Sequence, residues 1–155
     1  MNDTTAKPRI VVGVDGSGSS RAALRWALRQ AALVGATVEA VTTWEYPVYY
    51  GLGMPMLDGD FAGFAGKALA EAVAEEAGRD CPVEVQERVA RGNAAQVLLM
   101  AAEGAELLVL GSRGHGGFTG ALLGSVTQHC VQHASCPVVV IREPGREIAE
   151  PADGG

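Results

Sequence analysis

The chain has 155 residues, of which 48% are hydrophobic and 19% are charged. A chain of this length and composition can bury the core of one domain, which disfavours intrinsic disorder. Its 21 glycines follow no Gly-X-Y period, which excludes a collagen-like structure. Its formal net charge of -6 disfavours the phosphate backbone of nucleic acids and anionic membrane surfaces, so we expect neither as a partner.

The terminal residues and the cysteines indicate a cytoplasmic protein. The first ten residues contain no apolar signal-peptide core, and the apolar runs are too short to cross a bilayer. Three cysteines without a CxxC pair favour reduced thiols. We expect one folded domain at residues 8–143, between a flexible N-terminus at 1–7 and a flexible polar tail at 144–155.

The chain begins with a predicted strand and a predicted helix. Residues 9–14 are almost continuously apolar, which is typical of a strand covered on both faces. Serines at positions 17, 19 and 20 can cap the helix that follows. The side of this helix predicted to face the core carries Leu24, Leu28, Ala31 and Val34. The side predicted to be solvated carries Arg21, Arg25 and Arg29.

A second strand, a long loop and a second helix come next. Gly35 ends the first helix, and residues 37–43 predict a strand. The segment from Trp44 to Phe61 has no period, and we expect a long loop of the kind that forms lids or interfaces. Residues 62–77 predict a helix with Leu69 and Val73 facing inward.

The C-terminal half adds three strands and two helices. Residues 82–88 alternate in polarity and predict a strand at the sheet edge. Asn93 is expected to cap a helix that runs to about residue 103, and residues 106–110 predict a buried strand. A helix at 125–133 and a strand at 137–141 complete the domain.

This alternation predicts an α/β fold with a doubly wound, five-stranded parallel sheet. In such sheets a ligand binds beyond the carboxyl ends of the strands, at the point where the strand order reverses. Two loops that carry polar and glycine residues follow strand ends, at 15–17 and at 111–125. If the first and fourth strands are neighbours, both loops face one crevice.

The second of these loops carries the binding chemistry. It contains Gly111, Gly114 and Gly124, whose missing side chains let backbone amides approach an anion. Ser125 follows at a helix start, where free amides and the helix dipole favour phosphate. The loop lacks the Gly-Lys-Ser/Thr ending of a Walker A motif. It therefore predicts a phosphate ligand, and a flexible loop with a capping serine is the alternative.

The motifs resemble those of the universal stress protein family. The spacing Gly111-x2-Gly114-x9-Gly124-Ser125 is similar to the family's ATP-binding motif. The opening VVGVDGS at residues 11–17, the turn at Gly92 and the closing CPVVV at 136–140 are also similar. The resemblance extends over almost the whole chain, from residue 9 to residue 142.

The resemblance implies strand order 3-2-1-4-5, an adenine-nucleotide α-hydrolase-like fold, and ATP with Mg²⁺ as the ligand. Asp15 would meet the adenine and ribose side, Val41 would pack on the base, and Gly92 would line the rim. The remaining implied contacts, to ribose and phosphates, are Gly111, Gly114, Gly124 and Ser125. The family also implies a homodimer through Val138–Ile141, an apolar edge strand.

Several alternatives stay open at this stage. Asp15 can contact a nucleotide or form an Asx turn. Arg113 and His115 can reach a terminal phosphate or remain solvated. His129, Cys130 and His133 have metal-like spacing on one helix, but packed or surface side chains are the more common reading and we assign no metal site.

The expected function is nucleotide-dependent regulation or stress response. Phosphoryl transfer needs a base and a cationic clamp, and the glycine loop has no Walker lysine, so we expect little or no hydrolysis and assign no catalytic residue. The alternatives are a slow ATPase or nucleotidyl-transfer enzyme, and a structural dimer that binds no nucleotide.

Overall fold

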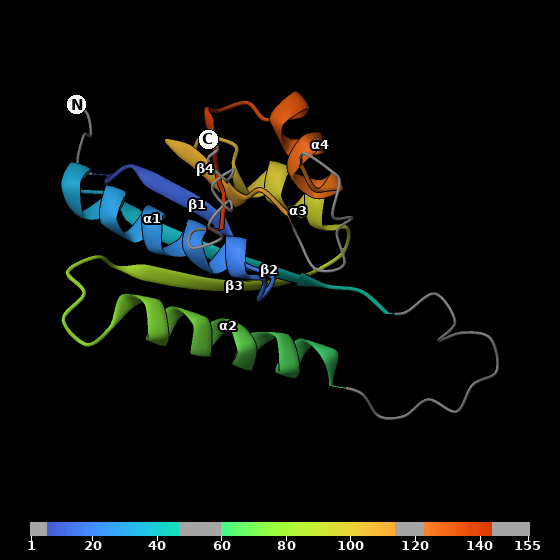
Figure 1. The fold of residues 1–155 in the computed structure, drawn as a ribbon, viewed down its shortest axis with the longest axis horizontal. Coiled ribbons are helices and arrows are strands. Elements are labelled where there is room, and N and C mark those ends of the chain that lie inside the picture. The colour runs from blue at the N-terminus through green and yellow to red at the C-terminus, as the bar shows by residue number, and fades with distance from the viewer. Residues whose placement is uncertain (1–5, 47–59, 114–122, 144–155) are drawn as a thin grey trace, which may run out of the picture.

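The computed structural model of the chain describes residues 6–46, 60–113 and 123–143. Five parallel strands form one sheet in the order β3-β2-β1-β4-β5, with helices on both faces (Figure 1). The predicted α/β class, doubly wound topology and strand order are confirmed. In chain order, the elements are β1 (Arg9–Gly13), α1 (Gly18–Val34), β2 (Thr37–Trp44), α2 (Phe61–Ala77), β3 (Val85–Arg91), α3 (Ala94–Ala101), β4 (Leu107–Gly111), α4 (Ser125–His133) and β5 (Val138–Ile141).

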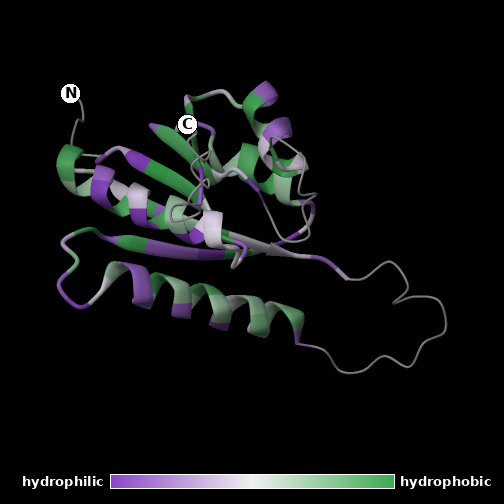
Figure 2. Cartoon of the chain, in the orientation of Figure 1, coloured by the Kyte–Doolittle hydropathy of each residue, from purple (hydrophilic) through white to green (hydrophobic). Residues whose placement is uncertain are grey.

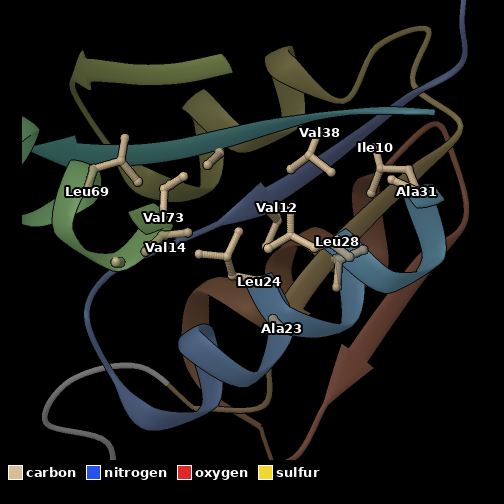
Figure 3. Close-up of a cluster of buried hydrophobic side chains, with 14 of the residues drawn as sticks. Ile10, Val12, Val14, Ala23, Leu24, Leu28, Ala31, Val38, Leu69 and Val73 are labelled. Atoms are coloured by element: carbon tan, nitrogen blue, oxygen red, sulfur yellow. The ribbon is translucent and has the colours of Figure 1, made fainter. Parts of the chain in front are cut away.

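The central strands are buried on both sides because their side chains alternate between two cores. On β1, Ile10 and Val12 lie in the core beneath α1 and α2, whereas Val11 lies in the core beneath α3 and α4. Figure 3 shows the first core, in which Leu24 and Leu28 of α1 extend toward β1. The near-continuous apolar run at the start of the chain is thus explained by its central place in a three-layer structure.

Strand β3 lies at one edge of the sheet, as the sequence predicted, but three residues later than predicted. It was expected at 82–88 and lies at Val85–Arg91. Its register is set by pairing with β2, from Val38 opposite Val85 to Trp44 opposite Arg91. A polar alternating segment carries no signal for such a register. The strand is largely exposed, and Figure 2 shows it mostly in the hydrophilic colour.

Helix α1 follows its predicted pattern except in its last turn. Leu24, Leu28 and Ala31 are buried as expected, but the prediction for Val34 is wrong, because its side chain is 47% exposed. Gly35 ends the helix in the left-handed conformation, with φ of 75°, and its N–H donates to the Ala31 carbonyl. Val34 is the last residue of the helix, so no further turn continues the apolar side there and the period does not determine whether Val34 is covered.

The arginines on α1 were expected to be solvated, and two of them, although partly exposed, also form ion pairs. Arg25 Nε donates to Glu76 Oε1 at 2.8 Å, and Arg21 Nε donates to Glu76 Oε2 at 3.2 Å. Arg21 also pairs with Glu75. These ion pairs join α1 to α2, a neighbour that the helical period alone could not identify. The hydrogen bond from Arg25, together with the nearby positive charges, lowers the pKa of Glu76 below its usual value of 4.5.

We expect the contribution of Glu76 to stability to depend on pH. Because the pKa of Glu76 is lowered by folding, its stabilising effect is present above pH 4.5 and is lost as the pH falls through the folded value. Glu76→Gln is therefore expected to cost about 1 kcal/mol at pH 7 and much less near pH 3. Urea unfolding at both pH values measures this, with the exposed Glu71→Gln on the same helix as control. An equal loss at both pH values would contradict the assignment.

Candidate functional site

The candidate site lies where the strand order reverses, at the carboxyl ends of β1 and β4. These strands are neighbours in the sheet, with Val12 opposite Val109. The turn after β1 and the segment after β4 therefore leave the same edge side by side, as the sequence predicted for a doubly wound sheet.

Asp15 organises the turn between β1 and α1. Its Oδ1 accepts hydrogen bonds from the Ser17 N–H at 2.9 Å and from Ser17 Oγ at 2.6 Å. Gly16 between them has φ of +87°, a conformation that favours glycine. Of the two roles considered for Asp15, the Asx turn is present in the structure. The residue is exposed, and its expected nucleotide contact stays a prediction.

Gly111, at the end of β4, lies against the first turn of α1. A Cβ at this position would be 2.4 Å from Ser19 Oγ, 2.6 Å from the Ser19 carbonyl carbon and 2.7 Å from the Ser20 nitrogen. Packing against α1 alone therefore requires glycine here, apart from any role toward a phosphate.

The chain after β4 is held by Ser19 of α1 and by β5. Ser19 Oγ donates to the Arg113 carbonyl at 2.6 Å and accepts from the Arg113 N–H at 3.3 Å. The Ser112 N–H donates to the Ile141 carbonyl of β5 at 2.8 Å. The start of the glycine loop thus has a fixed place between α1 and β5.

The other end of the loop is the N-terminus of α4. Gly124 is the N-cap in extended conformation, and its N–H donates to the Ser112 carbonyl at 2.7 Å. Ser125 is the first helical residue, as predicted, and is exposed. The buried Thr127 donates from Oγ1 to the Gly111 carbonyl at 2.7 Å. Glycine supplies no capping side chain, and among the described residues no side-chain hydrogen bond caps the first turn of α4, whose amides are of the kind that can bind an anion.

Val41 and Gly92 lie along the same edge of the sheet, on β2 and after β3. Val41 is level with Gly13, the last residue of β1, and its side chain is 1% exposed in the core beneath α3. Gly92 has φ of +135° and donates its N–H to the Trp44 carbonyl at 2.9 Å. Gly114 and His115 lie outside the described residues, so their expected roles stay predictions.

Ser19 and Thr127 are two polar residues of this site that sequence reasoning did not identify. Ser19 was considered only as a helix cap, and Thr127 was not considered. The available signal was a pair of hydroxyl residues in the first turns of the two helices that flank a glycine-rich strand end. The missing information was that α1 and α4 both approach β4 there.

The histidines and cysteines form no metal centre in the part of the chain that the structure describes. No group of three His, Cys, Asp or Glu residues there could hold a metal ion. The His129 and His133 rings lie 4.6 Å apart, whereas Cys130 is fully buried in the core beneath α3. Burial raises the pKa of the Cys130 thiol to about 11, so the thiol stays protonated near neutral pH.

An aromatic group lies at the carboxyl ends of β2 and β3. Trp44, Tyr46 and Phe61 contact one another, with ring centroids 5.1 to 6.2 Å apart. The guanidinium of Arg91 lies 4.8 Å from the Tyr46 ring. Trp44, Tyr46 and Phe61 come from the two ends of the predicted long loop, whose residues 47–59 lie outside the described part.

Of the helices in the described residues, none is long and apolar enough to cross a membrane.

The fold and its carboxyl-edge site define an α/β protein of the adenine-nucleotide α-hydrolase-like class. The sequence model of the universal stress protein family matches residues 8–142, and the chain belongs to this family. A universal stress protein of Mycolicibacterium smegmatis is 37% identical over 137 residues, which are 86% of this chain and 45% of that protein. The chain spans about half the length of the curated relatives that it matches.

Solved structures agree with this assignment. The universal stress protein UspA from Lactobacillus plantarum superposes with a TM-score of 0.73 at 25% identity, over 90% of this chain and 100% of that one. A universal stress protein in complex with cAMP superposes with a TM-score of 0.58 at 26% identity, over 90% of this chain and 99% of that one.

Proposed function

We propose that this chain binds ATP between the ends of β1 and β4 and acts as a nucleotide-dependent regulatory or stress-response module. The observation that carries the proposal is the N-terminus of α4, where a glycine cap and the exposed Ser125 stand beside the end of β4. Free amides and the helix dipole at such a position favour a phosphate. The relative solved with cAMP supports an adenine nucleotide as the ligand class.

In this proposal the two halves of the site have different tasks. Asp15, Val41 and the rim at Gly92 would form the adenosine half, which contacts the base and the ribose. Asp15 belongs to this half because its carboxylate would repel phosphates. The phosphate half would comprise Gly111, Gly114, Gly124 and Ser125. Mg²⁺ would enter with the triphosphate, because it binds the phosphate oxygens, and would neutralise part of their charge.

We propose binding with little or no hydrolysis. Fast phosphoryl transfer needs a cationic clamp and a placed base, and the described end of the glycine loop contributes Arg113 as its one cation. A slow ATPase is the second candidate, favoured by that same arginine. We also propose a homodimer through Val138–Ile141, since β5 is an edge strand made only of apolar residues.

Calorimetric titration of ATP and Mg²⁺ into the wild type and a Gly124→Val, Ser125→Ala double variant tests the proposal. Gly124 has φ of -68° and ψ of 159°, which valine adopts without strain, so the fold should persist. We expect micromolar binding in the wild type and a loss of about a hundredfold in the variant, because the valine side chain crowds the phosphate position. Gln128→Ala, on the next turn of α4, is the control that should bind normally.

The possible failures of this experiment separate the candidate functions. Wild-type protein that is free of nucleotide and gives no heat would favour a structural dimer that binds nothing. Steady-state turnover well above background, abolished in the double variant, would favour the ATPase. Binding that survives in the double variant would place the nucleotide elsewhere.

A further inference from the structure

Ser19, in the first turn of α1, connects that helix to the segment after β4, and the residue is only 3% exposed. Its hydroxyl donates to the Arg113 carbonyl at 2.6 Å and accepts from the Arg113 N–H at 3.3 Å. One side chain thus binds both polar groups of a single peptide residue, as a neighbouring strand would. The backbone is therefore still hydrogen-bonded at Arg113, two residues after Gly111, the last residue of β4.

Ser17 does not duplicate this contact. Its Oγ lies 3.4 Å from the Arg113 carbonyl but 2.6 Å from Asp15 Oδ1. A hydroxyl has one proton, and the shorter, charge-assisted hydrogen bond to the carboxylate takes it. Ser17 therefore shapes the Asp15 turn, and Ser19 is the side chain that attaches the segment after β4 to α1.

The close approach at Gly111 makes the Ser19 contact specific in position. Because the backbones of Gly111 and of α1 nearly touch there, the Ser19 hydroxyl can meet Arg113 only with β4 seated against α1. At the far end of the loop, Gly124 and Thr127 bind Ser112 and Gly111. Those two bonds hold α4 to the end of β4, whereas Ser19 holds the segment after β4 to the first turn of α1, which follows the Asp15 turn directly.

We infer that Ser19 is a positioning residue, which sets the distance between the adenosine half and the phosphate half of the nucleotide site without touching the nucleotide. This inference rests on the proposed function. ATP spans both halves, so its affinity depends on their separation. AMP contacts less of the phosphate half, so its affinity depends less on the separation of the two halves. A residue that only supported the fold would affect both ligands equally.

The test compares Ser19→Ala with wild type and with Asp60→Ala. Asp60 is a matched control, because its Oδ1 accepts one hydrogen bond at the N-terminus of α2, from the Gly63 N–H at 2.9 Å, away from β1 and β4. ATP and AMP affinities are measured by calorimetry, AMP by competition where its heat is small. Exchange of the Arg113 amide by NMR and the melting temperature are measured on the same samples.

We expect Ser19→Ala to weaken ATP about tenfold, the equivalent of ~1.4 kcal/mol, to weaken AMP less than about twofold, and to speed exchange of the Arg113 amide. Asp60→Ala should lower the melting temperature similarly and change neither affinity. Unchanged ATP affinity in Ser19→Ala, or equal losses for ATP and AMP, would overturn the inference while leaving ATP binding intact. Wild-type protein that binds no ATP would overturn the inference and the proposed function together.

Discussion

Gly111→Val is expected to destabilise the folded chain by about 3 kcal/mol or more. The new Cβ would be placed 2.6 Å from a backbone carbon of Ser19 and 2.7 Å from the backbone nitrogen of Ser20. Backbone of a helix cannot yield as a flexible side chain can, so α1 must move away from β4. That displacement disturbs the core around Val109 and separates Ser19 from Arg113.

Gly66→Ala provides the contrast for this prediction. Gly66 lies within α2, where an added Cβ would be 3.6 Å from Val89 Cγ2, an ordinary packing distance. Alanine costs less conformational entropy than glycine in a helix, so this variant is expected to gain about 0.5–1 kcal/mol. Urea denaturation of both variants measures the difference. A Gly111→Val protein as stable as wild type would show that α1 and β4 are not in contact in solution.

The fold could be predicted from the sequence because its signals are local and repeated. The apolar runs of β1 and β4, the cap at Asn93 and the glycine at Gly35 each lie within a few residues of the element that they define. The alternation of strands and helices then leaves few topologies. The predicted limits of strand β3 were three residues too early, because the true limits depend on pairing with β2, a contact between segments far apart in the sequence.

The candidate site was predictable only in part, for the same reason. Asp15, Gly124 and Ser125 belong to turns and helix starts that the sequence marks locally. The role of Gly111 as a contact surface for α1, and that of Ser19 as its partner, require knowledge of which helix crosses which strand end. Val34 was wrongly expected to be buried, and the ion-pair partners of Arg21 and Arg25 were not predicted, because a helical period shows one apolar side but not which elements lie beside the helix.

A buried carboxylate in the middle of β2 was also missed. The Glu39 side chain is 12% exposed and accepts hydrogen bonds from Arg9 Nη1 at 3.1 Å and from Arg88 Nη1 at 3.2 Å. Arg9 additionally donates to the carbonyl of Ala101, the last residue of α3, at 2.6 Å and to that of Glu103, just after the helix, at 2.9 Å. A charged residue inside an apolar strand is the sequence signal for such an arrangement, since a buried charge needs partners. Glu39 thereby connects β1, β2 and β3, and the hydrogen bonds of Arg9 extend this network to the end of α3.

Glu39→Gln is expected to lower the free energy of unfolding by about 2–3 kcal/mol, because it leaves two arginines facing an amide that carries no charge and can turn a donor toward one of them. Glu75→Gln is the matched control. Glu75 also pairs with an arginine, but its side chain is 65% exposed, and its loss should cost less than about 0.5 kcal/mol. Urea denaturation at low salt and at 1 M salt separates the two, since screening weakens exposed pairs far more than buried ones. If both variants lost the same small amount of unfolding free energy, water would already satisfy the hydrogen bonds of the partly exposed arginines. Glu39 would then contribute only to the strand register.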